Sequence, residues 1–147
     1  MLDDLLYGIG ATLVYLAMGV GLLVAGFLAL DAVTPGRLGH LVMGHGTGRP
    51  SMGAGVLAAA AMLATGLVVF TALWTNVQDG LGRTVVFTLV FGLIGVVAQA
   101  ASFVVVDLLT PGRLGDEVLG PDRVHPAALL AAAAQLATAG VVCASIA

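Results

Sequence analysis

Four long apolar segments divide the chain, and short polar segments separate them. The apolar segments are Tyr7 to Leu30, Ser51 to Trp74, Thr84 to Val106 and Ala127 to Ala147. At about 1.5 Å of rise per helical residue, each is long enough to cross a hydrocarbon core about 30 Å thick. None contains Asp, Glu, Lys, Arg or His. The pattern predicts an all-α polytopic membrane protein with four transmembrane helices in a single domain.

The composition supports the membrane-protein class and limits the kinds of partner that the chain is expected to bind. Hydrophobic residues make up 60% of the chain and charged residues 9%, and the mean hydropathy is +1.12; soluble domains carry about 25% charged residues. The net charge of -3 argues against a nucleic acid partner, which requires a basic surface to neutralise phosphates. The expected partner is therefore the lipid bilayer.

Arginine positions predict the orientation. Arg37 and Arg49 precede the second span, and Arg113 and Arg123 precede the fourth, whereas Arg83 alone lies at the other side of the spans. Because cytoplasmic loops carry an excess of cations, we expect both long loops to be cytoplasmic. Both termini would then lie outside a bacterial inner membrane.

The chain contains an internal repeat. Asp31 to Gly39, which reads DAVTPGRLG, recurs as DLLTPGRLG at Asp107 to Gly115, an offset of 76 positions. Extending the match to residues 31–44 and 107–120 gives nine identities in fourteen. The chain is thus predicted to be two parallel two-helix repeats, residues 7–74 and 83–147. Because both copies enter the membrane from the same side, we expect an axis along the membrane normal to relate them.

The repeated motif predicts a turn followed by a short helix. Thr34 would be the N-cap and Pro35 the first helical residue, with the helix running to about Met43 and stopping at Gly44. An acidic residue at the end of a transmembrane helix opposes the helix dipole, so Asp31 is expected to pair with Arg37. The second copy would use Asp107, Thr110, Pro111 and Arg113 in the same way. A structural clamp is the first interpretation, and contact with a partner or a phosphate headgroup is the second.

Two glutamines are the notable polar residues within the spans. Gln99 lies seven residues before the end of its span and Gln135 eight residues after the start of the next, so their depths coincide. Adjacent antiparallel helices could therefore pair the two amides. The alternative is that both line a polar pathway in an oligomeric channel.

Small residues recur every four positions along the first span, at Ala17, Gly21, Ala25 and Ala29. Such a ridge permits close approach of helix backbones. Packing inside the monomer and packing in a homo-oligomer both remain open.

Catalysis has little support. The sequence lacks paired intramembrane carboxylates, a catalytic triad pattern and a phosphate-binding glycine loop. His40 and His45 are five residues apart, a spacing that does not place both on one helical face, and no histidine within a span could ligate a haem. We expect no enzyme activity, no metal and no cofactor.

Two copies of a two-helix unit, each ending in Asp-x-x-Thr-Pro, resemble the bacterial inner-membrane family catalogued as domain of unknown function 350. The motif stands at Asp31, Thr34 and Pro35 and again at Asp107, Thr110 and Pro111. The resemblance implies a small inner-membrane protein without assigned activity, encoded near envelope-stress proteins. Our first functional hypothesis is a non-enzymatic assembly or scaffold component whose repeated loops face a cytoplasmic or membrane protein partner. The second hypothesis is a small channel or transporter formed by an oligomer.

Overall fold

The structure, a computed structural model, describes residues 1–34, 37–45, 49–110 and 125–147. Its elements, in chain order, are α1 (Leu2–Val33), α2 (Leu38–Met43), α3 (Met52–Asn76), the 3-10 turn η1 (Val77–Asp79), α4 (Leu81–Leu109) and α6 (Pro126–Ile146). Helices α1, α4 and α6, together with α3 and its continuation η1, are long and apolar enough to cross a membrane. This confirms the predicted all-α membrane class.

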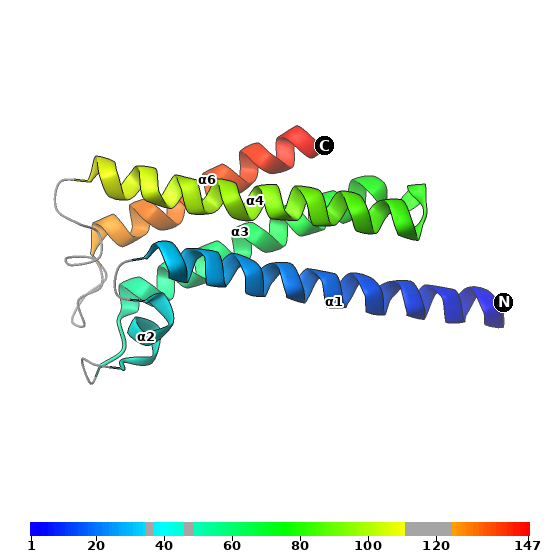
Figure 1. Cartoon of the computed structure of the whole chain (residues 1–147), viewed down its shortest axis with the longest axis horizontal. Helices are drawn as coiled ribbons and strands as arrows, with labels where there is room; N and C mark the ends of the chain where they lie inside the picture. The colour runs from blue at the N-terminus through cyan, green and yellow to red at the C-terminus, as the bar shows by residue number, and fades with distance from the viewer. Residues whose placement is uncertain (35–36, 46–48, 111–124) are drawn as a thin grey trace.

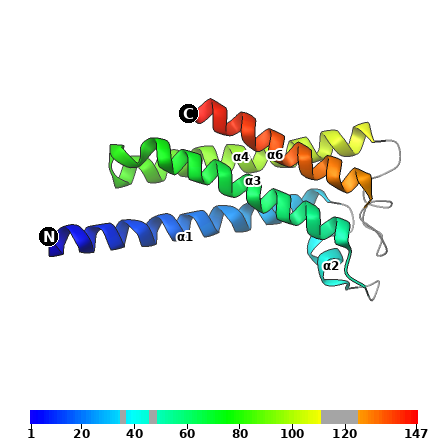
Figure 2. The same ribbon diagram turned by 180° about the vertical axis from the view of Figure 1, so that it is seen from behind.

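The four long helices form two layers. Helices α1 and α4 lie side by side in one layer, and α3 and α6 lie side by side in the other, as the two opposite views show (Figures 1 and 2). Helices α1 and α4 run in one direction, and α3 and α6 run back in the other. We refer to the end where α1 and α4 finish as the α2 end and to the opposite end, which holds the α3–α4 turn, as the η1 end.

Threonine followed by proline ends α1 and α4 in the same way. Thr34 has φ -84° and ψ 122°, and Thr110 has φ -86° and ψ 119°, because a residue before proline is pushed out of the helical region. Each hydroxyl donates to the carbonyl four residues earlier, 2.7 Å to Leu30 and 2.8 Å to Val106. Thr34 is therefore the C-cap of α1, and its prediction as an N-cap of the short helix is wrong.

The short helix α2 packs on the long helices at the α2 end through Leu38, with Leu41 and Val42 partly buried beside it. Arg37, with a positive φ of 59°, is its N-cap, and Gly44 in the left-handed region (φ 72°) ends it, as the sequence predicts for Gly44. Leu38 is fully buried. It packs in a cluster with residues of the long helices, namely Leu30, Ala54, Leu57, Ala58, Ala61, Phe103, Ala128 and Ala131. The predicted second short helix, Pro111 to about Leu119, lies outside the described residues.

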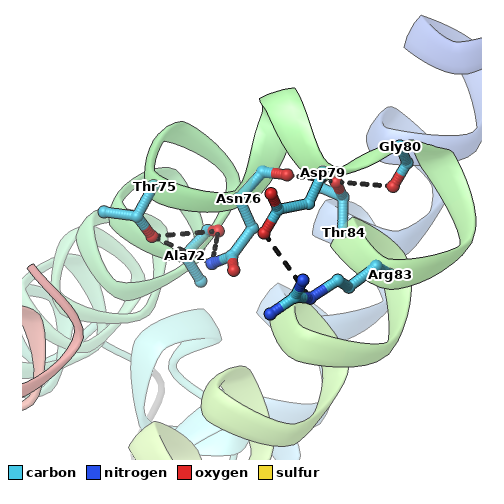
Figure 3. Close-up of polar contacts among 7 residues, drawn as sticks. All are labelled: Ala72, Thr75, Asn76, Asp79, Gly80, Arg83 and Thr84. Carbon is cyan, nitrogen blue, oxygen red and sulfur yellow. Dashed lines mark hydrogen bonds and ion pairs between the residues drawn. The ribbon is translucent and has the colours of Figure 1, made fainter.

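The α3–α4 turn at the η1 end is held mainly by one threonine (Figure 3). The buried Thr84 hydroxyl donates to the carbonyls of Asn76, at 2.6 Å, and Gly80, at 3.0 Å. Arg83 forms an exposed ion pair with Asp79, with 3.5 Å between Nε and Oδ2. The turn thereby joins the two hairpins, α1–α3 and α4–α6, with few residues.

The two hairpins bury different faces of their repeat-related helices. Six residues are buried on α6, namely Ala128, Ala131, Ala132, Gln135, Ala139 and Val142. Their counterparts 76 positions earlier on α3 are all half-buried or exposed, namely Met52, Gly55, Val56, Ala59, Leu63 and Gly66. Likewise, no residue buried on α4 has a buried counterpart on α1. The helix faces that are buried in the second hairpin are thus half-buried or exposed at the equivalent positions of the first hairpin.

This exchange of faces excludes a two-fold rotation as the relation between the repeats. A two-fold axis would bury the same positions in both repeats and would match the α3–α4 contact with an equal α6–α1 contact. Within the described residues, α3 packs closely on α4 but α6 and α1 share no comparable interface. The two hairpins therefore lie side by side without two-fold symmetry, and each presents a different face to the other.

Candidate functional site

A cluster of three polar side chains lies in the middle of the bundle. It consists of Thr65 on α3, Gln99 on α4 and Gln135 on α6, all buried. Nε2 of Gln135 donates to the backbone carbonyl of Gln99 at 3.1 Å. The Thr65 hydroxyl lies 2.9 Å from the Ala61 carbonyl oxygen and 3.3 Å from Oε1 of Gln99, so two acceptors share its proton. The cluster thus links three helices at one depth.

The structure brings Gln99 and Gln135 together, but not amide to amide as the sequence predicts. Gln135 uses the backbone of Gln99, and the Gln99 side chain turns to Thr65. Thr65 is the member that sequence reasoning missed, because a threonine in an apolar helix usually bonds its own backbone. One sequence feature could have identified Thr65. It lies one turn after Ala61, on the same face of α3 as the small residues.

Close approach of α1 completes the cluster. An added Cβ on Gly26 of α1 would lie 2.7 Å from the Thr65 hydroxyl oxygen. Gly26 therefore lets α1 pack directly over Thr65. Nε2 of Gln99 and Oε1 of Gln135 have no hydrogen-bond partner among the described residues. The cluster is consequently buried, with hydrogen bonding that is incomplete at these two atoms.

Replacing Gln135 with leucine should change the stability of the bundle little. The substitution removes one hydrogen bond, worth about 0.6 kcal/mol on average between membrane helices, and also removes a buried oxygen that lacks a partner. Gln135→Ala, by contrast, leaves a cavity and should cost about 2 kcal/mol. Unfolding in mixed micelles by titration with SDS measures both. Equal losses for the two variants would show that the amide itself is required.

The motif at the end of α1 caps the short helix through its aspartate. Oδ1 of Asp31 accepts a hydrogen bond from the backbone N–H of Gly39, in the first turn of α2, at 2.8 Å. A negative charge at this end of a helix is also favourable for the helix dipole. Among the described residues Asp31 is paired with this N–H and not with the guanidinium of Arg37, which is exposed. Asp31 therefore joins the end of α1 to the start of α2.

The rest of the motif is described in part. Thr110 repeats the Thr34 cap, and Asp107 stands one turn before the end of α4. Pro35, Pro111 and Arg113 lie outside the described residues. The contacts of the turn are therefore described for the first copy of the motif.

Removing the Asp31 carboxylate should loosen α2. Asp31→Ala deletes the acceptor for Gly39 and should cost about 1 kcal/mol, as loss of a helix cap does, whereas Asp31→Asn keeps an acceptor and should cost less. Hydrogen exchange at the Gly39 amide reports the effect directly. Unchanged protection in Asp31→Ala would show that the contact does not hold α2.

The small-residue ridge of α1 faces away from the bundle. Ala17 and Gly21 are exposed, and Ala25 and Ala29 are half-buried. A Cβ added to Gly21 would meet nothing within 4 Å. The residues that α1 buries are instead Leu22, Gly26 and Leu30. Ala17 and Gly21 therefore face outward, whereas Ala25 and Ala29 are partly covered within the chain.

Comparisons with known proteins identify the family. The sequence model described as Domain of Unknown Function (DUF350) matches residues 4–146. The chain belongs to the DUF350 family. A UPF0719 transmembrane protein of Mycolicibacterium paratuberculosis is 36% identical over 145 residues, covering 99% of this chain and 92% of the relative.

Two further relatives of this DUF350 chain carry the same description. UPF0719 transmembrane proteins of Mycobacterium bovis and Mycobacterium tuberculosis are each 34% identical over 145 residues, covering 99% of this chain and 91% of each relative. No solved structure matches the chain significantly. Relatives and structure agree on a transmembrane protein of an uncharacterised family.

Proposed function

We propose that this DUF350 protein is a non-enzymatic inner-membrane component that works by assembling with further copies of itself. The observation that carries the proposal is the exposure of α1. None of its residues from Leu2 to Gly21 is buried, although their apolar sequence places most of them inside the membrane. On one side α1 presents its small-residue ridge, and on another it borders an apolar groove with α3. Both surfaces suit helix packing between copies.

Subunit counting tests self-assembly. Fluorescently labelled chains reconstituted into liposomes at a low protein-to-lipid ratio should bleach in more than one step per particle. A lipid-only vesicle preparation and a monomeric membrane protein with the same label provide the references. A distribution matching the monomer would overturn the proposal.

The buried glutamines support a packing role over a channel between copies. A pathway between copies needs polar side chains on the outer surface of the bundle. Gln99 is only 5% exposed and Gln135 is fully buried inside one chain. Liposomes carrying the protein should therefore show no selective ion flux. Flux that disappears in Gln99→Leu or Gln135→Leu would favour the channel hypothesis instead.

The α2 end is proposed as the cytoplasmic face that meets partners or lipid headgroups. Arg37, His40 and Arg49 are exposed there, which fits the excess of cations in cytoplasmic loops. A single cysteine at His40 in a Cys143→Ala background should resist membrane-impermeant maleimide in intact cells. Labelling of His40→Cys without permeabilisation would reverse the proposed orientation.

A further inference from the structure

The surface of hairpin α1–α3 that faces away from α4–α6 contains an apolar groove of about 450 Å³. Among its lining residues are Thr12, Leu16, Gly19 and Leu23 of α1 and Gly66 and Phe70 of α3. Below, "the α1–α3 groove" means this surface. This groove is exposed, whereas the equivalent surface of the second hairpin is buried, and the difference requires an explanation.

The α1–α3 groove is the repeat counterpart of the surface that α4–α6 buries. Counting 76 positions on, five of the six α1 residues that line the groove become buried residues of α4, namely Thr88, Gly92, Gly95, Val96 and Gln99, and the sixth, Tyr15, becomes the half-buried Phe91. Gly19 and Gly95 are identical in the two repeats. The first hairpin thus exposes a docking surface that its partner hairpin uses inside the chain.

The opposite surface of the second hairpin is the matching ridge. Helix α6 exposes four small residues at helical spacing, Ala133, Ala137, Gly140 and Ala144. We call this set the α6 ridge. Its counterparts on α3 are Leu57, Ala61, Ala64 and Val68, all buried against the second hairpin. Each hairpin therefore has one ridge and one groove. Within the chain, the α3 ridge of the first hairpin packs against the groove of the second hairpin, and the α1–α3 groove and the α6 ridge stay open.

The contact inside the chain shows how ridge and groove fit. A Cβ added to Gly95 would lie 3.0 Å from Cγ1 of Val68, so α3 approaches α4 closely at this glycine. Ala144 is the repeat counterpart of Val68, and Gly19 is the repeat counterpart of Gly95. When the same contact forms between two chains, Ala144 of one chain lies against Gly19 of the other. The contact between chains also supplies an extensive α6–α1 interface, which the described residues of one chain do not form.

We propose that a second copy of this chain fills the α1–α3 groove with its α6 ridge, in the same orientation in the membrane. This inference rests on the proposed self-assembly and adds which surfaces meet. Such a contact joins two different surfaces, so a pair of copies keeps one free ridge and one free groove, one on each copy, to which further copies can add. The small side chains on both surfaces allow the close backbone packing that drives helix association in lipid.

Cysteine cross-linking between differently marked chains tests the arrangement. In a Cys143→Ala background, one chain carries Gly19→Cys and the other carries Ala144→Cys, and the two are reconstituted separately and together in liposomes. After oxidation, the mixture should give a disulfide-linked dimer, and each variant alone should give none. The matched control replaces Gly19→Cys with Gly21→Cys, which lies at a similar depth on the other side of α1, and should stay at background.

Each alternative outcome has a distinct reading. A disulfide-linked dimer of either variant alone would show that identical surfaces of two copies meet, and would overturn the inference. Cross-linking of the Gly21 control at the same yield would show that the α6 ridge does not select the α1–α3 groove, with the same consequence. If subunit counting still finds several copies but the mixture does not cross-link, the inference fails and the proposed self-assembly stands. Monomers in the counting experiment would overturn both.

Discussion

Replacing Gly26 with valine is expected to destabilise the bundle by about 3 kcal/mol, because overpacking costs about 1–3 kcal/mol and a lost hydrogen bond about 1 kcal/mol more. The first added carbon would lie 2.7 Å from the Thr65 hydroxyl oxygen. Thr65 cannot move away easily, since it is buried and bonded to Ala61 and Gln99. Helix α1 would have to separate from α3, and the polar cluster would lose its cover.

Unfolding by titration with SDS measures this loss, and Gly10→Val provides the control. Gly10 lies on the same helix, and a Cβ there would meet nothing within 4 Å. Both variants add the same side chain to an apolar helix, so their difference isolates the contact with Thr65. Equal stability of the two variants would show that α1 does not pack closely over the cluster.

The sequence predicts the membrane spans well and their ends less well. The predicted first span, residues 7–30, compares with an observed helix at Leu2–Val33. Hydropathy detects the part of a helix that must avoid water, whereas the end depends on backbone hydrogen bonds. At Thr34 the hydroxyl had two possible helices to cap, and only the structure shows that it bonds backward to Leu30.

The arrangement of the repeats could not be predicted from the sequence for a geometric reason. Two hairpins that enter the membrane from the same side can be related by a rotation about the normal or by a shift in the plane. Both relations give the same loops, the same span lengths and the same offset of 76. They differ only in which face each helix buries, and the apolar helices are hydrophobic on all sides. Gly19 and Gly95, which are identical in sequence, differ in burial for this reason.

The polar cluster shows a similar limit. Matching depth was enough to bring Gln99 and Gln135 together, because adjacent antiparallel helices fix depth. Which atoms pair depends on helix rotation and side-chain rotamers, which the sequence does not give. In the structure Gln135 bonds to the backbone of Gln99, and the side chain of Gln99 accepts from Thr65.

Replacing Leu38 with alanine is expected to cost about 2 kcal/mol, at the low end of the range for buried leucines. Leu38 is fully buried in the core cluster at the α2 end, whereas Leu41 and Val42 of α2 pack against that cluster only partly buried. Shortening it leaves a cavity between α2 and the long helices, while the cap from Asp31 to Gly39 remains. Helix α2 should therefore open more often without unfolding of the bundle.

Hydrogen exchange of α2 and limited proteolysis at the α2 end measure this opening, alongside the overall stability. Met43→Ala is the matched control, because Met43 lies on the same short helix, is 71% exposed and has a similar helix propensity. Faster exchange in Leu38→Ala but not in Met43→Ala is the expected result. If both variants exchange alike, the buried leucine does not hold α2, and the face proposed to meet partners has no fixed structure of its own. If only Leu38→Ala opens, one buried side chain and one carboxylate together fix the shape of that face.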